Sequence, residues 1–237
     1  MNKKRVVIKL SGELMGDPRS DSNLDFILIK KLAQSLQKLV KAGYQVAVVV
    51  GAGNIFRARM IKGQEIDRVE ADHMGMLATN INALALRSVL EKIGQEARIM
   101  SAWPVENIMW GFNHECAIRN LNEKRVMIFA GGTGHPYFTT DTTMVLRALE
   151  IKAGYIYKAT NVIGVYDKDP EKYKNAKLYK KLSYDEALKK ELKIVDATAF
   201  ALARDNNIEL TVFKYSPANL FKAVTKNIIG TKVKNNN

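Results

Sequence analysis

The sequence predicts an α/β fold, a three-layer α/β/α sandwich in which helices cover both faces of a mostly parallel sheet. Runs rich in β-branched residues alternate along the chain with segments of helical periodicity. These strand-like runs are continuously apolar, which is typical of strands buried on both faces. Because strands that alternate with helices form parallel βαβ units, both observations favour this fold class.

Six strands are expected, at residues 5–10, 45–50, 98–101, 125–130, 155–159 and 209–213. Five helices are expected between and after them, at residues 26–42, 72–92, 142–151, 196–204 and 217–227. The first helix carries one apolar stripe, which is formed by Ile29, Leu32, Leu36 and Leu39. Ser216 followed by Pro217 is typical of a helix start, and Ser183 with Glu186 has the spacing of a capping box.

The composition is that of an ordinary globular protein. The chain has 237 residues, of which 47% are apolar and 26% are charged, and this excludes a charge-dominated disordered chain. Such a chain forms one large or two small domains and buries roughly 70% of its unfolded surface. Cys116 is the only cysteine, so no disulfide can form within the chain. With no signal peptide pattern and no apolar run near the roughly 20 residues of a membrane span, we expect a cytoplasmic protein without a membrane partner.

The chain is strongly basic, with 37 basic and 24 acidic residues and a formal net charge of +13. Such a charge suits nucleic acid, an acidic membrane surface or small anionic substrates such as nucleotides. The lysines are spread over the whole chain, however, and a basic stripe with interleaved aromatic residues, typical of RNA binding, is not visible. We therefore interpret most of the charge as solvated surface, expect no nucleic-acid partner, and interpret residues 232–237 as a frayed tail.

Three turns rich in glycine or hydroxyl groups follow predicted strands directly, at residues 9–12, 51–54 and 131–134. Such turns expose backbone N–H groups that bind phosphate, although each alone is equally compatible with a structural turn. The second turn lacks the last glycine of the dinucleotide fingerprint, because Phe56 stands there, and the P-loop pattern is absent. Since ligands bind at the carboxyl ends of parallel strands, three such turns predict a phosphate site of another kind.

Lys9 and Lys158 each interrupt an apolar strand near its end. A buried ammonium group is costly unless an anion meets it, so the two lysines suggest a charge clamp for phosphate. The structural alternative is that Lys9 extends from an edge strand to water.

Phosphoryl transfer needs cations around the moving group, in-line positioning and usually magnesium. Arg57 is a candidate for further positive charge beside the two lysines. Asp141 and Asp196 are candidates for orienting a lysine or holding the metal, and each also has the position of a helix N-cap, which is the commoner role of aspartate there.

Five ordered segments resemble the bacterial uridylate kinases, which belong to the amino acid kinase superfamily. These segments are KLSGE at 9–13, GAGNIFR at 51–57, DHMGMLAT at 72–79, TGHPYFTTD at 133–141 and LKIVD at 192–196. The similarity runs from about residue 5 to residue 231. Segments 72–79 and 133–141 are the most specific, because the glycine turns are shared with acetylglutamate, aspartate and carbamate kinases.

The resemblance implies an amino acid kinase-like domain over residues 1–237 that transfers the γ-phosphoryl group of Mg-ATP to UMP, giving UDP and ADP in pyrimidine nucleotide synthesis. It implies that residues 1–150 mainly bind UMP and residues 151–231 mainly bind ATP. It also implies Mg²⁺ held mainly through the nucleotide phosphates, a homohexamer, and feedback inhibition by UTP. Activation by GTP stays open, because residues 16–23 do not resemble the stretch linked to it.

The resemblance also assigns the site residues. The catalytic group comprises a cationic clamp of Lys9, Arg57 and Lys158, with Asp141 and Asp196 as organisers. ATP is assigned to Lys9, Leu10, Ser11, Gly12, Gly53, Arg57, Thr160, Tyr166 and Asp169. UMP is assigned to Ala52, Asp72, Thr133, Gly134, His135, Pro136, Tyr137, Phe138, Thr139 and Thr140. Asp72 is expected at the ribose, since a carboxylate accepts hydrogen bonds from vicinal hydroxyl groups, and the threonine-rich loop is expected around uracil.

Four residues depart from the family pattern. Ala52 replaces a glycine, which is tolerable if its φ is negative or its Cβ points away from the ligand. His135 replaces an asparagine in the uracil loop, and Asn161 and Ile163 replace a lysine and an aspartate beside the adenine pocket. At these positions base recognition and nucleotide affinity are expected to differ from those of the family.

Two other functions stay open from the residues alone. One is a non-catalytic regulator that binds nucleotide or nucleic acid, which the net charge suggests. The other is a kinase of the same fold that acts on a carboxylate or a carbamate. The presence of Lys9, Arg57, Asp141 and Asp196 together favours an enzyme, and segment 72–79 favours UMP. His73 and Trp103 are interpreted as packing residues without a chemical role.

Overall fold

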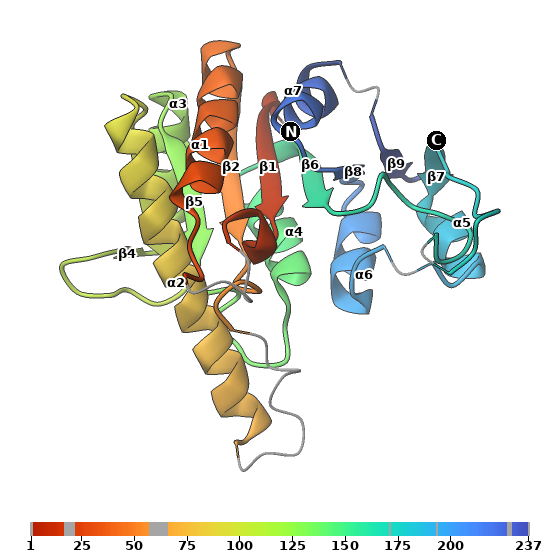
Figure 1. Ribbon diagram of the computed structural model, residues 1–237, viewed down its shortest axis with the longest axis horizontal. Coiled ribbons are helices and arrows are strands. Elements are labelled where there is room, and N and C mark those ends of the chain that lie inside the picture. The colour runs from red at the N-terminus through yellow and green to blue at the C-terminus, as the bar shows by residue number, and fades with distance from the viewer. Residues whose placement is uncertain are drawn as a thin grey trace.

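The computed structural model describes residues 2–16, 22–56, 66–170, 172–192, 194–226 and 229–236. Within them the chain forms a nine-stranded sheet with the order β4-β3-β5-β2-β1-β6-β8-β9-β7 (Figure 1). The strands are β1 (Asn2–Leu10), β2 (Gln45–Val50), β3 (Ala97–Ser101), β4 (Trp110–Gly111), β5 (Val126–Ala130), β6 (Ala153–Thr160), β7 (Lys181–Ser183), β8 (Glu209–Lys214) and β9 (Thr231–Lys234). The helices are the short 3₁₀ helix η1 (Gly12–Leu14) and α1 (Phe26–Lys41), α2 (Arg68–Lys92), α3 (His114–Asn122), α4 (Thr140–Glu150), α5 (Tyr184–Lys189), α6 (Ala197–Asp205) and α7 (Pro217–Lys226).

Helices cover both faces of the sheet, so the predicted three-layer α/β fold is confirmed. Successive residues of a strand point to opposite faces, and β1 shows this clearly. Ile8 packs in the core formed with α1, α2 and α7, whereas Val7 packs in the core formed with α3, α4, α5 and α6. Both residues are fully buried, which explains why the strands are continuously apolar in sequence.

The central strand β1 pairs in parallel with β2 on one side and with β6 on the other. In this register Lys9 is paired with Val49 of β2 and with Lys158 of β6. Strand β2 pairs in parallel with β5. The carboxyl ends of β5, β2, β1 and β6 therefore lie side by side, and the three predicted turns follow three of these strands.

Side-chain caps explain where several helices begin. The Asp67 carboxylate accepts a hydrogen bond from the N–H of Val69 at 2.6 Å, so α2 begins four residues before the predicted position 72. Figure 1 shows this long helix extending past the carboxyl ends of the strands. The predicted capping box of Ser183 and Glu186 is present at the start of α5. No helix of the described ranges is long and apolar enough to cross a membrane.

The prediction of a frayed tail at residues 232–237 was wrong for Lys232–Lys234, which together with Thr231 form strand β9 between β8 and β7. Val233 is fully buried in the core, and Thr231 accepts a hydrogen bond from the N–H of Val165 at 2.8 Å. A single apolar residue among lysines and asparagines gave no strand pattern in the sequence. The strand forms because the neighbouring strands supply its hydrogen-bond partners on both sides.

Four further elements were not predicted, namely η1, α3, β4 and β7, and of α5 only the capping box was. Helix α3 has a recognisable start, because Asn113 accepts a hydrogen bond from the N–H of Cys116 at 2.9 Å. Its nine residues bury only Ala117, Asn120 and Leu121, so its apolar stripe is short. Strands β4 and β7 have two and three residues, too few for any periodicity to be read.

Candidate active site

The candidate site lies at the carboxyl edge of β5, β2, β1 and β6, where the predicted turns meet. The turns at 9–12 and 51–54 touch, since the N–H of Gly51 donates to the Leu10 carbonyl at 2.8 Å. Helix α4 begins at the end of the third segment, 131–140, and α6 begins beside it. The arrangement places several backbone N–H groups and helix starts around one region, which suits anions.

Lys9, Lys158 and Asp141 form one ion-pair cluster. The Lys9 Nζ lies 3.2 Å from Asp141 Oδ1, and the Lys158 Nζ donates to Asp141 Oδ2 at 2.5 Å. The two lysine side chains are 15% exposed and the carboxylate is 13% exposed. The structure thus brings together three predicted residues and excludes the alternative that Lys9 extends freely from an edge strand, because β1 is the central strand.

Burial and charge compete in setting the pKa values of this cluster. Burial alone would raise the pKa of Asp141, but the Lys9 and Lys158 charges outweigh it and hold that pKa below its ordinary value. Burial also lowers the pKa of Lys158, and the adjacent Lys9 charge adds to this, while Asp141 acts in the opposite direction. The cluster thus contains two lysines and one carboxylate, and the nearby charge of Asp196 also acts on Lys158.

Asp196 has the helix-capping role that the sequence left open, and it also accepts hydrogen bonds from two threonines. As the N-cap of α6 it accepts a hydrogen bond from the N–H of Ala199 at 2.8 Å. It also accepts hydrogen bonds from the hydroxyl groups of Thr142, at 3.0 Å, and of Thr139. Thr142 was not among the predicted site residues, and its sequence position, one residue after Asp141, offers no signal of this contact.

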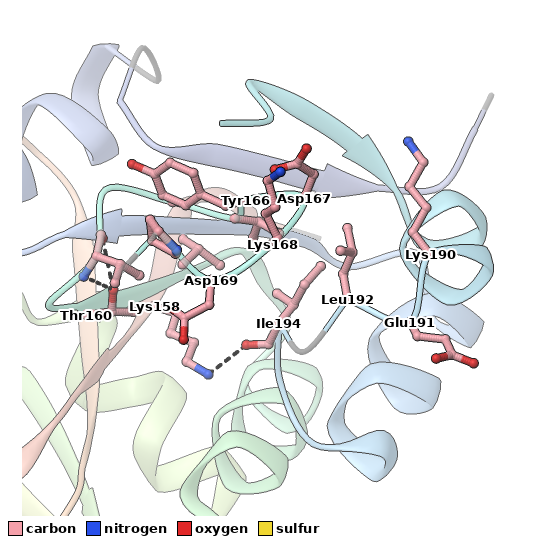
Figure 2. Close-up of a pocket in the computed structure, with 15 residues that line it drawn as sticks. Lys158, Thr160, Tyr166, Asp167, Lys168, Asp169, Lys190, Glu191, Leu192 and Ile194 are labelled. Atoms are coloured by element: carbon pink, nitrogen blue, oxygen red, sulfur yellow. Dashed lines mark hydrogen bonds between the residues drawn. The ribbon is translucent and has the colours of Figure 1, made fainter. Parts of the chain in front are cut away.

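A cavity of about 620 Å³ opens beside the lysine cluster. Figure 2 shows Lys158 at its inner end, where the Nζ donates to the Ile194 carbonyl at 2.8 Å. The predicted ATP residues Thr160, Tyr166 and Asp169 all line this cavity. The apolar lining of the cavity could not be predicted, because single apolar residues in loops and at strand ends carry no functional signal. This lining comprises Val165, Leu192, Ile194 and Val212.

Residues of the first two turns lie close together. A Cβ on Gly12 would overlap the side-chain oxygen of Asn54 and would lie 2.5 Å from the Gly53 nitrogen, so only glycine fits there. The Leu10 side chain is fully buried in the core, which leaves only its backbone toward the site. Ala52 is not in the left-handed region, so its methyl group causes no backbone strain. Arg57 lies outside the described residues.

The predicted UMP segment packs against α2. Its Tyr137 N–H donates to Asp72 Oδ2 at 2.8 Å, and Arg68 forms an ion pair with the same oxygen at 2.8 Å. Tyr137 has a φ of 70°, an unfavourable value for a residue with a side chain. Its ring and the Phe138 ring are largely exposed. Asp72 therefore fixes the shape of this loop, and its Oδ1 is not used by either contact.

The remaining predicted UMP residues form the turn and the start of α4. Thr133 accepts a hydrogen bond from the N–H of His135 at 3.2 Å, and Thr139 caps α4. Gly134 has a φ of 84°, and a Cβ there would lie 3.3 Å from the Trp103 Nε1. Pro136 continues the same segment after the turn, and Thr140 is the first residue of α4. The predicted site residues that the structure describes thus lie within one region at the carboxyl edge of the sheet.

The residues present suit a magnesium ion that arrives with a nucleotide. Both oxygens of Asp141 face lysines, and both oxygens of Asp196 accept hydrogen bonds from Thr142. Among the described residues no group of three or more His, Cys, Asp or Glu could hold a metal ion. Mg²⁺ in kinase sites is typically held by one or two carboxylates, substrate phosphates and water, and the site offers that kind of donor set.

Comparisons with known proteins point to one family. The chain matches the model of the amino acid kinase family over residues 4–214. It is 47% identical over 232 residues to a uridylate kinase from Xanthomonas oryzae pv. oryzae, covering 97% of this chain and 96% of that protein. It is similar to the crystal structure of UMP kinase from Ureaplasma parvum, with a TM-score of 0.93, 39% identity and coverage of 99% and 100% of the two chains. The UMP kinase structure from Bacillus anthracis gives a TM-score of 0.94, 35% identity and coverage of 99% and 97%.

Proposed function

Since the chain belongs to the amino acid kinase family and is a nucleoside monophosphate kinase, we propose that it transfers the γ-phosphoryl group of ATP to UMP, giving UDP and ADP. The observation that carries the proposal is the cluster of Lys9, Lys158 and Asp141 at the junction of the glycine turns. Phosphoryl transfer asks a protein mainly for positioning and charge, and this cluster supplies a fixed pair of cations.

The two lysines are the proposed clamp on the phosphoryl group in flight. Asp141 holds both ammonium groups at the edge of adjacent strands, so neither has to be ordered when the substrate binds. Asp196, fixed by two threonine hydroxyl groups and the start of α6, adds a second fixed carboxylate beside them. We propose Arg57 as a third cation, on the family resemblance alone.

Two substrate sites flank this centre in the proposal. The cavity lined by Thr160, Tyr166 and Asp169 suits the adenosine part of ATP, because it is apolar at its walls and ends at Lys158. Asp72 and the 133–140 segment suit UMP, with Asp72 Oδ1 available to a ribose hydroxyl group. On this basis residues 1–150 mainly bind UMP and residues 151–231 mainly bind ATP.

Magnesium bound to the ATP phosphates would neutralise charge on the transferred group. Asp141 and Asp196 are the described carboxylates placed to contact such an ion directly or through water. We also propose feedback inhibition by UTP, since it carries the same uracil and ribose groups as UMP and could occupy the Asp72 site.

We further propose that the chain assembles into a homohexamer. Helix α2 presents large apolar side chains to solvent, with Met74, Leu77 and Ile81 each more than 40% exposed. These residues follow helical spacing and form one stripe, and such a stripe is typical of an interface between subunits. Sedimentation velocity or light scattering would give the number of subunits.

The first experiment is a substrate panel. ADP formation with Mg-ATP is measured at fixed salt with UMP, CMP, dUMP, aspartate, acetylglutamate and carbamate. We expect turnover with UMP and none with the carboxylates or carbamate. Turnover only with a carboxylate or carbamate would retain the family and overturn the acceptor site. No turnover with any acceptor, together with nucleotide binding, would favour a regulator on the kinase fold.

A further inference from the structure

Asn54 and Asn82 form a buried pair of side-chain amides beneath the phosphate turns. Each Nδ2 donates to the Oδ1 of the other residue, at 3.0 Å and 2.8 Å. Asn82 lies in α2 and is fully buried, and Asn54 in the second turn is 1% exposed. Neither residue touches the lysine cluster in any described contact, and neither was among the individually predicted site residues, although Asn54 lies in the second predicted turn.

Each amide of the pair also holds a backbone carbonyl. The Asn82 Nδ2 donates to the Gly51 carbonyl at 2.7 Å, and the Asn54 Nδ2 donates to the Asn23 carbonyl at 2.7 Å. The pair therefore connects three parts of the chain: the turn after β2, the middle of α2 and the segment before α1. Buried polar groups that are fully paired define a single geometry, because every alternative leaves one of them unsatisfied.

The amide pair also reaches the turn after β1. Gly12 packs so closely on Asn54 that a Cβ on Gly12 would overlap the Asn54 Oδ1. The Gly51 N–H donates to the Leu10 carbonyl, which fixes the other side of the same contact. The turn expected to bind the ATP phosphates, at Ser11–Gly12, and the turn that holds Ala52 and Gly53 thus rest on one buried pair.

A second side chain of α2 holds the third turn. The Thr79 hydroxyl accepts a hydrogen bond from the Gly131 N–H at 2.7 Å and donates to the Met76 carbonyl at 2.6 Å. Thr79 is 2% exposed. Helix α2 therefore fixes the turns after β2 and β5 through two buried side chains, Thr79 and Asn82, that lie three residues apart on one face.

We infer that Asn54 and Asn82 are positioning residues for phosphoryl transfer, which set the distance between the phosphate turn at Ser11–Gly12 and the turn at Gly51–Gly53. The inference rests on the proposed function and assigns these residues a role beyond it. In-line transfer depends on the spacing of donor and acceptor, and a misplacement of about 1 Å costs about 100-fold in rate. Loss of the pair should therefore lower kcat while each substrate still binds its own half of the site.

The experiment compares Asn82→Ala, Asn54→Ala and the double variant with wild type. Asn120→Ala is the matched control, because Asn120 is also a buried helical amide, 4% exposed, but contacts Cys116 and Arg125 at the opposite edge of the sheet. The double variant Asn54→Leu/Asn82→Leu keeps branched side chains of similar shape without the hydrogen bonds. It replaces the alanine variants if one of them fails to fold. Measurements are kcat per folded protein, and the Kd values of ATP and UMP by calorimetry.

We expect kcat to fall about 10- to 100-fold in each Asn54 and Asn82 variant, with both Kd values within threefold of wild type. The double variant should resemble the single ones, because both remove the same pair. The control should keep kcat within twofold even where its melting temperature falls. A kcat per folded protein within twofold of wild type in the Asn82 variants, or a loss found entirely in one Kd, would overturn the inference.

Hydrogen–deuterium exchange separates this inference from the proposed function. Peptides covering 10–15 and 50–56 should exchange faster in Asn82→Ala than in wild type, and equally in Asn120→Ala. If wild type makes no UDP from UMP, the proposed function fails, whereas the exchange still tests whether the pair holds the two turns. Equal exchange in the Asn82 variant and wild type would overturn the inference whatever the substrate.

Discussion

The strongest test of the lysine cluster is the substitution Asp141→Asn. It keeps the shape of the side chain and one carbonyl oxygen, but it removes the charge that holds Lys9 at 3.2 Å and Lys158 at 2.5 Å. The two ammonium groups then lie next to each other on adjacent strands without an anion. Because both lysines are only 15% exposed, water compensates for the lost carboxylate poorly.

The expected loss of stability follows from these distances. At an effective dielectric constant of about 20, Coulomb attraction at 3.2 Å and 2.5 Å amounts to about 5 and about 7 kcal/mol before any compensation. Desolvation of the three groups in the native state, and the carbonyl that asparagine retains, reduce the net value. Breaking a buried ion pair typically costs about 3–5 kcal/mol, so we expect a loss of about 3 kcal/mol at pH 7. We expect kcat to fall by about 100-fold, because the clamp is no longer fixed.

The pH dependence gives this prediction a sign. In wild type the ionised Asp141 has a lowered pKa, so its contribution is present above the ordinary value of 3.8 and is lost as pH falls through the lowered one. Lys158 already has a lowered pKa, and without Asp141 its pKa should fall further. In the variant, Lys158 therefore loses its proton, and with it its positive charge, at a lower pH than in wild type. The stability gap between wild type and variant should therefore narrow between pH 7 and pH 10.

The assay is urea unfolding at pH 7 and pH 10, together with kcat at saturating Mg-ATP and UMP. Asp205→Asn is the matched control, because its exposed carboxylate pairs with Arg204 at the surface and should contribute less than about 1 kcal/mol. A kcat within threefold of wild type would remove Asp141 from the clamp. A stability gap that is small at pH 7, or that does not change with pH, would refute the electrostatic reasoning.

Four further predictions concern single groups of the site. Lys9→Ala should lower kcat about 100-fold and change the KM for UMP less than threefold, and steady-state kinetics would show the opposite pattern if Lys9 only bound substrate. Asp72→Asn should weaken UMP binding about 10- to 100-fold in calorimetry and leave ATP unchanged; lost ATP affinity would contradict the site assignment. The alkaline decline of kcat due to Lys158 should lie below the ordinary lysine pKa of 10.5, and a pH profile flat to that value would oppose this. Thr142→Val should lower kcat roughly 10-fold, because it removes a hydrogen bond that holds Asp196, and it should change the melting temperature little. Full activity would show that the Thr139 hydroxyl alone is enough to hold Asp196.

Much of the fold was readable because buried parallel strands and amphipathic helices leave long patterns. The strands around Lys9 and Lys158 were predicted within three residues, and their order in the chain set the sheet edge at which the turns meet. Short elements were not readable, since β4 and β7 have too few residues to show a pattern, and β7 pairs with β9, which is distant in sequence. Strand β9 was missed for the same reason, as Val233 alone is too little apolar sequence to indicate a strand.

The site was readable where a costly residue type stood out locally. A lysine at the end of an apolar strand is such a signal, and so is an aspartate at a helix start after a glycine turn. Thr142, Asn54 and Asn82 gave no such signal, because their contacts depend on which helix packs against which turn. The apolar residues that line the cavity beside Lys158 gave no such signal either. The residues that could not be predicted are thus mainly those that hold another site residue or a turn in place.

The pairing of β1 with β6 makes the clamp dependent on the order of synthesis. Lys9 is made almost at once, whereas Lys158 emerges from the ribosome only after α2, α3 and α4. Until then one edge of β1 lacks its neighbour and is open to mispairing, which chaperones commonly prevent. A nascent or prematurely terminated chain can possess all three glycine turns and still lack half of the clamp. On the proposed function, the full pair of lysines is therefore assembled only late in translation, and a chain that ends before Lys158 should not turn over ATP.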